Sequence, residues 1–215
     1  MSFPDGYRDY EPIQPRGTDW RGLARRLFGP LIAGAVALAK FSFVLIKFSS
    51  IFIAVGGYAL IWGWTFAAGF VFLILLHELG HFVEAKREGL DPRLPVFIPF
   101  FGAYVRYTRG NPWQTARIAL AGPILGGVAS LAFLLVGIAQ GSDQLKALAY
   151  FGFFLNLINL APVGFLDGGA VWRSAKLLRH GGGRGKATFV YALYGATALA
   201  LVVGMVVSHV PQHRL

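Results

Sequence analysis

The sequence predicts an all-α polytopic membrane protein, a bundle of about five to six helices with a short re-entrant β-hairpin or loop near residues 95–107. Three observations lead to this fold class. Hydrophobic residues make up 55% of the 215 positions and charged residues only 14%, whereas soluble domains are roughly 25% charged. Several stretches reach the roughly 20 apolar residues that span a hydrocarbon core. The charged residues lie mainly between those stretches.

Charge and cysteine content narrow the functional classes. The formal net charge is +10, but the basic residues flank apolar segments, as they do in the cytoplasmic loops of membrane proteins. No nucleic-acid partner is expected, because a nucleic-acid-binding protein gathers such charges on one face. The chain has no cysteine, which excludes a disulfide framework and a thiolate metal site. A bound metal would therefore take His, Asp or Glu as ligands.

The chain divides into a tail, a membrane-embedded domain and a short end. Residues 1–27 are polar, basic and rich in proline and glycine, and we expect a mostly disordered cytoplasmic tail there. Residues 28–210 form the predicted membrane-embedded domain, and residues 211–215 form a C-terminal tail. The N-terminal residues do not resemble a cleavable secretory leader. Together with the absence of cysteine, this suggests a multi-pass protein of a bacterial plasma membrane.

The first apolar region is long enough for two crossings. It runs almost without interruption from Leu27 to Leu76, and breaks are available at Gly56, Gly57 and Gly63. Lys40 and Lys47 lie on one helical face, so residues 28–47 are either a span or an interfacial helix.

The remaining elements follow from apolar runs and the breaks between them. Residues 90–110 are too rich in proline and glycine for a helix and too apolar for a water-exposed loop, so we expect the hairpin or re-entrant loop at Val96–Tyr107. The expected helices are about Thr65–Glu88, Pro112–Ala139, Gln144–Leu160, a basic segment around Arg173–Arg179, and a last span at Ala187–Val207.

The basic residues predict an orientation. If the N-terminal tail, residues 86–117 and residues 173–186 all face the cytoplasm, they place 16 of the 20 Lys and Arg residues on that side. This asymmetry is typical of membrane proteins. We therefore expect a cytoplasmic N-terminus, and we expect the helix at about Thr65–Glu88 to end on the cytoplasmic side.

The clearest chemical motif is HExxH, in the segment from His77 to His81. Residues four apart share one face of a helix, so both imidazoles can bind one zinc ion while Glu78 reaches a metal-bound water. The alternative is a set of polar residues that cap a helix end. Ionisable groups next to a long apolar run are costly and usually functional, which favours a metal site with one Zn²⁺ per chain.

A catalytic zinc usually has three protein ligands and a water. Of the ten acidic residues, only Asp167 lies beside membrane-embedded sequence, apart from Glu78 itself. Asp167 is the best candidate for the third ligand, and a simple Asp-Gly turn is the alternative. His180, His209 and His213 lie in polar or opposite-side segments and fit a metal site less well.

Further motifs accompany HExxH in a fixed order. They are Ala121-Gly122-Pro123 in the following apolar helix and the pattern Asn159, Pro162, Leu166, Asp167, Gly168 near a later helix end. With these motifs the chain resembles the site-2 protease family of intramembrane zinc metalloproteases. The resemblance implies His77, His81 and Asp167 as zinc ligands, Glu78 as the catalytic base, and Asn159 as a residue that helps to hold substrate or the oxyanion.

The resemblance also implies what the protein acts on. The site would be reached by water from the cytoplasmic face and would cut substrate proteins within their transmembrane helices. Residues 95–107 are then a candidate for holding an unwound substrate stretch as an added strand; a plug over the site, or a cytoplasmic loop, is the alternative. The chain has room for neither the PDZ module nor the CBS pair of many members, so a minimal form is expected.

Two other functions remain as alternatives. Membrane zinc proteases that cut at the cytosolic surface take a downstream Glu as third ligand, but no Glu follows Glu88. A catalytically lapsed protease, or a zinc-binding membrane scaffold, would normally lack the base or a ligand, and none is missing here. The sequence carries no signal for the oligomeric state, the natural substrate or a trigger.

Overall fold

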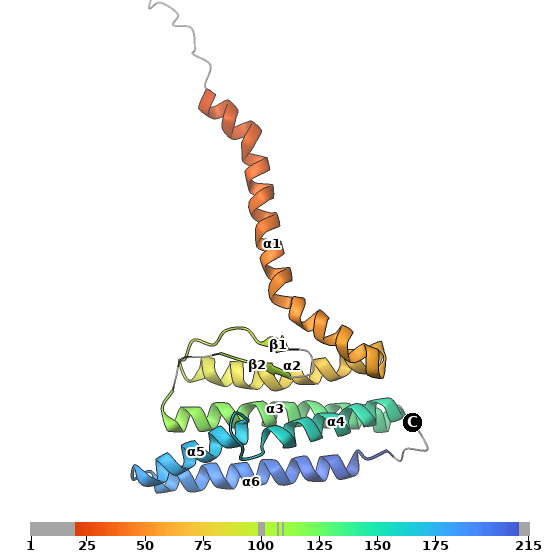
Figure 1. The fold of residues 1–215 in the computed structure, drawn as a ribbon, viewed down its shortest axis with the longest axis vertical. Helices are drawn as coiled ribbons and strands as arrows, with labels where there is room; N and C mark the ends of the chain where they lie inside the picture. Colours follow the sequence, from red (N-terminus) through yellow and green to blue (C-terminus); the bar gives the residue numbers. More distant parts are fainter. Residues whose placement is uncertain (1–19, 99–101, 107, 109, 211–215) are drawn as a thin grey trace, which may run out of the picture. The chain divides into compact units, whose positions relative to one another are not determined.

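In the computed structural model, the described residues are 20–98, 102–106, 108 and 110–210. They form six α-helices and one two-stranded sheet (Figure 1). The helices are α1 (Trp20–Trp62), α2 (Trp64–Arg87), α3 (Pro112–Ala139), α4 (Asp143–Asn159), α5 (Asp167–His180) and α6 (Arg184–Val207). The strands are β1 (Val96–Ile98) and β2 (Gly102–Tyr104). The mostly helical fold with a short hairpin is the one expected.

The chain separates into two units, residues 1–46 and 47–215. In the first unit the described part is the N-terminal portion of α1, which begins at Trp20. Residues 20–27, the last part of the predicted tail, are helical, and the assignment of residues 1–27 to a cytoplasmic tail stays a prediction. Residues 1–19 and 211–215, the other parts of the expected tails, lie outside the described residues. Both alternatives considered for residues 28–47 are helical, and the backbone there is a helix.

Three helices of the second unit are long and apolar enough to cross a membrane: α2, α3 and α6. They indicate a multi-pass membrane protein. Helix α3 packs against α2, α4 and α5, and together with α4 it lies between α2 and α6 (Figure 1). Helix α3 therefore lies at the centre of this bundle.

Local sequence explains where these helices begin and end. Gly63, with φ of 79°, breaks the apolar run between α1 and α2, because this left-handed conformation is unfavourable for other residues. The first turn of α3 has a capping box, in which the Asn111 side chain accepts from the Gln114 N–H and the Gln114 side chain accepts from the Asn111 N–H. Pro112 fits the first helical position, where no N–H is needed.

The hairpin lies where the sequence predicts it, in the expected 95–107 segment. Its antiparallel register pairs Val96 with Tyr104 and Ile98 with Gly102. The Phe97 side chain is buried in an apolar cluster with Tyr58 and Phe70, and its N–H donates to the Ser50 hydroxyl at 3.3 Å. The hairpin is therefore anchored to the membrane bundle and contacts α2.

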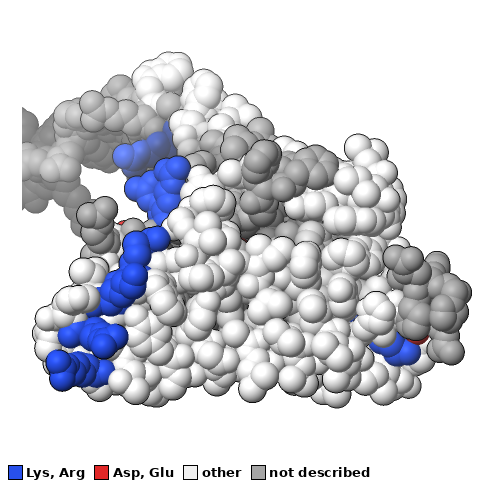
Figure 2. Space-filling model, turned by 60° about the horizontal axis from the view of Figure 1, so that its bottom comes forward, with Lys and Arg blue, Asp and Glu red and all other residues white. Residues whose placement is uncertain are grey.

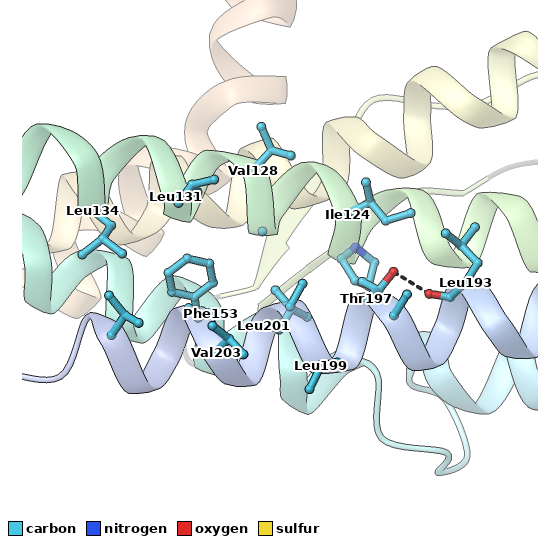
Figure 3. Close-up of a pocket in the computed structure, with 16 residues that line it drawn as sticks. Ile124, Val128, Leu131, Leu134, Phe153, Leu193, Thr197, Leu199, Leu201 and Val203 are labelled. Atoms are coloured by element: carbon cyan, nitrogen blue, oxygen red, sulfur yellow. Dashed lines mark hydrogen bonds between the residues drawn. The ribbon is translucent and has the colours of Figure 1, made fainter.

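An apolar groove of about 770 Å³ lies between α3, α4 and α6 (Figure 3). Its one hydroxyl, on Thr197, donates to the Leu193 carbonyl at 2.8 Å and so has its partner within the helix. None of the predicted site residues lines this groove.

Candidate metal centre

Helix α2 places the three HExxH side chains together. His77, Glu78 and His81 are buried, with 3%, 5% and 7% of their surfaces exposed. One possible ligand atom from each lies within 4.8 Å of those of the other two. The helical spacing expected from the sequence therefore does bring both imidazoles and the carboxylate to one place.

Asp167 joins this cluster from another helix. It is the first residue of α5, where the positive end of the helix dipole favours a carboxylate. Its Oδ2 lies 3.2 Å from His77 Nε2 and 3.3 Å from His81 Nε2. The two Nε2 atoms lie 3.1 Å apart, so three potential ligand atoms form a nearly equilateral triangle.

The size of the triangle fits zinc. Tetrahedral coordination at about 2.0–2.2 Å from nitrogen and oxygen places neighbouring ligand atoms roughly 3.3–3.5 Å apart. The observed edges of 3.1, 3.2 and 3.3 Å are close to that value. A set of two imidazoles and one carboxylate is also one of the common ligand sets of catalytic zinc.

The outer nitrogens of both rings have the partners that a metal-binding histidine needs. His81 Nδ1 lies 2.8 Å from the Ile118 carbonyl, which can only accept, so Nδ1 carries the hydrogen. His77 Nδ1 lies 2.7 Å from Asn156 Oδ1. The Asn156 amide nitrogen donates to the Gly152 carbonyl at 2.7 Å, which leaves its oxygen to accept from His77. Both Nε2 lone pairs then face the triangle, as zinc ligation requires.

Two glycines of α3 make room for this arrangement. A Cβ at Gly122 would overlap His81 Nε2, and a Cβ at Gly126 would overlap the Asn156 side-chain amide. The sequence suggested only that these glycines allow helices to pack closely. Here the close approach places the His81 imidazole and the Asn156 side-chain amide directly against the α3 backbone.

Charge favours the ionised carboxyl at Asp167. Burial by itself would raise its pKa, but the neighbouring His81 and His77 lower the pKa well below its usual range. Asp167 is therefore a carboxylate at neutral pH, the form that binds a metal.

Glu78 lies beside the two histidines of α2 and is contacted by the backbone N–H of Val105, the residue that follows β2 directly. The end of the hairpin thus lies next to Glu78, the fourth polar side chain of the cluster.

A second polar group ties α2 to α3 one turn beyond His81. Arg117 forms ion pairs with Glu84 at 2.6 Å and with Glu88 at 2.5 Å. Both carboxylates are mostly shielded, with 11% and 15% of their side chains exposed. Arg117 directly precedes Ile118, whose carbonyl accepts from His81, so the ion pairs fix the segment of α3 that orients this ring.

Asn159 lies apart from the hydrogen bonds described above. It is half-buried, and its amide donates to the Leu155 carbonyl at 3.2 Å. The asparagine that contacts a candidate ligand is Asn156, one turn earlier and fully buried. Sequence reasoning missed Asn156. Its signal was a polar residue within the apolar helix α4, on the turn before Asn159.

The other histidines lie elsewhere. His180 Nδ1 contacts the Lys176 carbonyl at the end of α5, and the His209 ring packs near Tyr150. His213 lies outside the described residues. Among the described residues, the possible metal-binding group of histidine and acidic side chains is the one in α2.

Comparisons with known proteins point to the same motif. Residues 65–144 match the family model described as peptidase family M50. A protein of Synechocystis sp. named as a zinc metalloprotease is 32% identical over 107 residues, which cover 47% of this chain and 28% of that protein. A chloroplastic protein of Arabidopsis thaliana, also named as a zinc metalloprotease, is 30% identical over 115 residues, which cover 46% of this chain and 21% of that protein.

The matched region therefore spans less than a third of either relative. No solved structure gives a significant match. The family match contains the HExxH motif and the glycines of α3, and it ends before Asp167. Over residues 65–144 the chain is thus similar to peptidase family M50, and both relatives named are zinc metalloproteases, in agreement with the resemblance that its own motifs carry.

Proposed function

We propose that this protein is an intramembrane zinc metalloendopeptidase, which hydrolyses peptide bonds in the transmembrane segments of substrate proteins. The observation that carries the proposal is the triangle of His77, His81 and Asp167 atoms, with edges of 3.1–3.3 Å, beside the buried Glu78. This cluster lies towards the end of a candidate membrane span. A substrate within the bilayer could therefore reach it.

Each residue has a distinct role in this proposal. His77, His81 and Asp167 hold one Zn²⁺ per chain, which lowers the pKa of a bound water and polarises the scissile carbonyl. Glu78 accepts a proton from the attacking water and delivers it to the nitrogen of the leaving amine. Asn156 and the Ile118 carbonyl hold the two imidazoles in orientation. Asn159 remains our candidate for a contact to substrate.

The hairpin gives a way to present the substrate. A transmembrane helix hides its carbonyls in hydrogen bonds, so it must unwind before a peptide bond can be attacked. Strand addition to the hairpin would hold the unwound stretch, and β2 leads directly to Val105 next to Glu78. Photo-crosslinking groups placed at Val96 and at Tyr104 should then capture bound substrate. Capture at neither position would favour a plug.

The proposed activity has a direct test. Purified protein in detergent is incubated with a panel of single-span helices, and metal-dependent fragments are identified by mass spectrometry. We expect the wild type to cleave at least one helix within its apolar segment. Glu78→Gln should lose cleavage while it keeps zinc, because glutamine cannot accept the proton. Full activity of Glu78→Gln, or cleavage that survives chelation of the metal, would refute the assignment.

A further inference from the structure

A second polar pocket lies away from the metal centre, between α5 and α6. It has a volume of about 620 Å³ and is lined by Trp172, Lys176, Arg179, His180 and Tyr191. The first four residues follow one face of α5, because each lies three or four positions from another member of the set: Trp172 from Lys176, Lys176 from Arg179, and Lys176 from His180. The Trp172 and Tyr191 rings meet edge to face with centroids 5.1 Å apart, so the two helices share an aromatic floor.

The pocket is cationic. Lys176 and Arg179 are exposed, and among the described residues neither forms an ion pair with an acidic side chain. Glu84 and Glu88 pair with Arg117, Asp143 pairs with Lys146, and Asp167 is at the metal centre. Lysine offers three N–H donors and arginine five. The pocket therefore presents donors and positive charge that no side chain in the described part of the protein neutralises.

The position of the pocket explains which anion it would meet. Basic side chains gather at one end of the second unit (Figure 2), the end expected to face the cytoplasm. Helix α5 is not among the candidate spans, whereas α6, which supplies Tyr191, is one of them. Tryptophan and tyrosine prefer the depth of the lipid headgroups. A cationic pocket with an aromatic floor at that depth lies level with the phosphates of the cytoplasmic leaflet.

We propose that this α5–α6 pocket binds the headgroup phosphate of an anionic phospholipid. Lys176 and Arg179 donate hydrogen bonds to the phosphate, and Trp172 and Tyr191 pack against the glycerol and the first acyl carbons. A free phosphate ion would make no use of an apolar rim. Such a rim is present, because Trp172 and Tyr191 line the pocket and Trp172 is 39% exposed. The lipid is therefore the favoured source of the phosphate.

This proposal does not depend on protease activity. It does place a lipid at one end of the 14-residue helix whose other end is Asp167. An occupied pocket would restrain α5 as a whole, and with it the carboxylate that approaches both imidazoles.

Native mass spectrometry of the full chain in a neutral detergent tests the proposal. Phosphatidylglycerol and phosphatidylcholine with identical acyl chains are titrated separately, and the first binding event is quantified. We expect the wild type to prefer phosphatidylglycerol. The double variant Lys176→Gln/Arg179→Gln should weaken that event by about thirtyfold, which is roughly fivefold for each cation near the membrane surface.

The matched control is Arg184→Gln/Lys186→Gln. It removes the same charge from the exposed start of α6 without touching the pocket lining, and it should weaken binding much less than the pocket variant does, because these two cations make no direct contact with a lipid in the pocket. Circular dichroism and zinc content show whether each variant is folded. Equal weakening by both double variants would mean diffuse attraction and would overturn the pocket. Equal binding of the two lipids, or displacement of lipid by inorganic phosphate, would also overturn the proposal.

Discussion

At the scale of single residues, the site depends on atoms that never touch the metal. Each candidate histidine ligand has one nitrogen in the triangle and one nitrogen held by a fixed acceptor, Asn156 Oδ1 for His77 and the Ile118 carbonyl for His81. A ring held in this way loses little freedom when it binds zinc, and partners of this kind commonly contribute tenfold to a hundredfold in metal affinity.

Asn156→Leu tests this positioning role. Leucine is similar in volume but cannot accept from His77, so the ring loses its fixed orientation. We expect zinc affinity, measured by competition with a chelator, to fall by about tenfold to a hundredfold. The matched control is Ser130→Ala, which removes another buried polar group whose bond goes only to the Gly126 carbonyl. Zinc affinity that is equal in both variants would show that Asn156 does not orient His77.

Candidate ligands could be predicted from the sequence, but their supporting atoms could not. HExxH is local, so its geometry follows from one helix, and Asp167 follows from elimination among ten acidic residues. The roles of Asn156, Gly122 and the Ile118 carbonyl depend on how α3 and α4 approach α2. No spacing within the sequence encodes that distance, which is why the glycines could be interpreted only as packing residues.

At the scale of elements, the position of α2 relative to α3 determines the site. The Arg117 guanidinium pairs with Glu84 and Glu88 on α2 through its two terminal nitrogens. A guanidinium can bind both carboxylates at once because its donors form a rigid fork. Arg117 directly precedes Ile118, whose carbonyl orients His81. The two ion pairs therefore hold α2 and α3 in the relative position that the metal centre requires.

Substitution of Arg117 should show how much these ion pairs contribute to the stability of the protein. Arg117→Gln removes the cation shared by Glu84 and Glu88 and leaves Glu84 with the longer 3.8 Å contact to Arg87. We expect a loss of stability on the order of 1–2 kcal/mol, since the guanidinium is partly exposed. The thermal midpoint of the purified protein should fall by a few degrees. Arg117→Lys should restore only part of the loss, because one ammonium group cannot make both contacts.

A surface pair serves as the control for that measurement. Lys146 pairs with Asp143 at 3.0 Å within the first turn of α4. A single partly exposed pair three residues apart on one helix contributes little. Lys146→Gln should therefore change the midpoint by less than a degree or so. If Arg117→Gln behaves in the same way, the ion pairs at Arg117 do not hold the two helices.

The boundaries of most elements were predictable, and the start of α1 was not. The helix ends at Ala139 and Val207 and the hairpin near residue 96 follow from apolar runs and from proline and glycine. The tail is predicted over residues 1–27 because this segment is polar and rich in proline and glycine, but its prolines all lie before Trp20. Arginine, leucine and alanine, which are frequent after Trp20, favour helices.

At the scale of the whole molecule, the distribution of basic residues predicts which side the site faces. Lys and Arg gather at one end of the second unit (Figure 2), while the first turn of α4 carries Lys146, which is paired with an acid. Positive loops are retained in the cytoplasm. Because α2 ends with Lys86 and Arg87 shortly after His81, we propose that the site opens towards the cytoplasm.

The absence of cysteine makes this orientation simple to measure. Single cysteines are introduced at two exposed positions, Thr108→Cys beyond the hairpin and Gln140→Cys at the far end of α3. A maleimide that cannot cross membranes is then applied to intact bacterial cells. We expect it to label Gln140→Cys directly and Thr108→Cys only after the cells are permeabilised. The reverse pattern would place the basic end and the site outside.

The most direct test of the account is the zinc content of purified Asp167→Ala beside that of the wild type and Glu78→Gln. We predict about one zinc per chain in the wild type and in Glu78→Gln. Asp167→Ala should lose most of its metal, because two imidazoles alone do not complete a catalytic site. Wild-type zinc content in Asp167→Ala would contradict the three-residue centre on which the proposed chemistry depends.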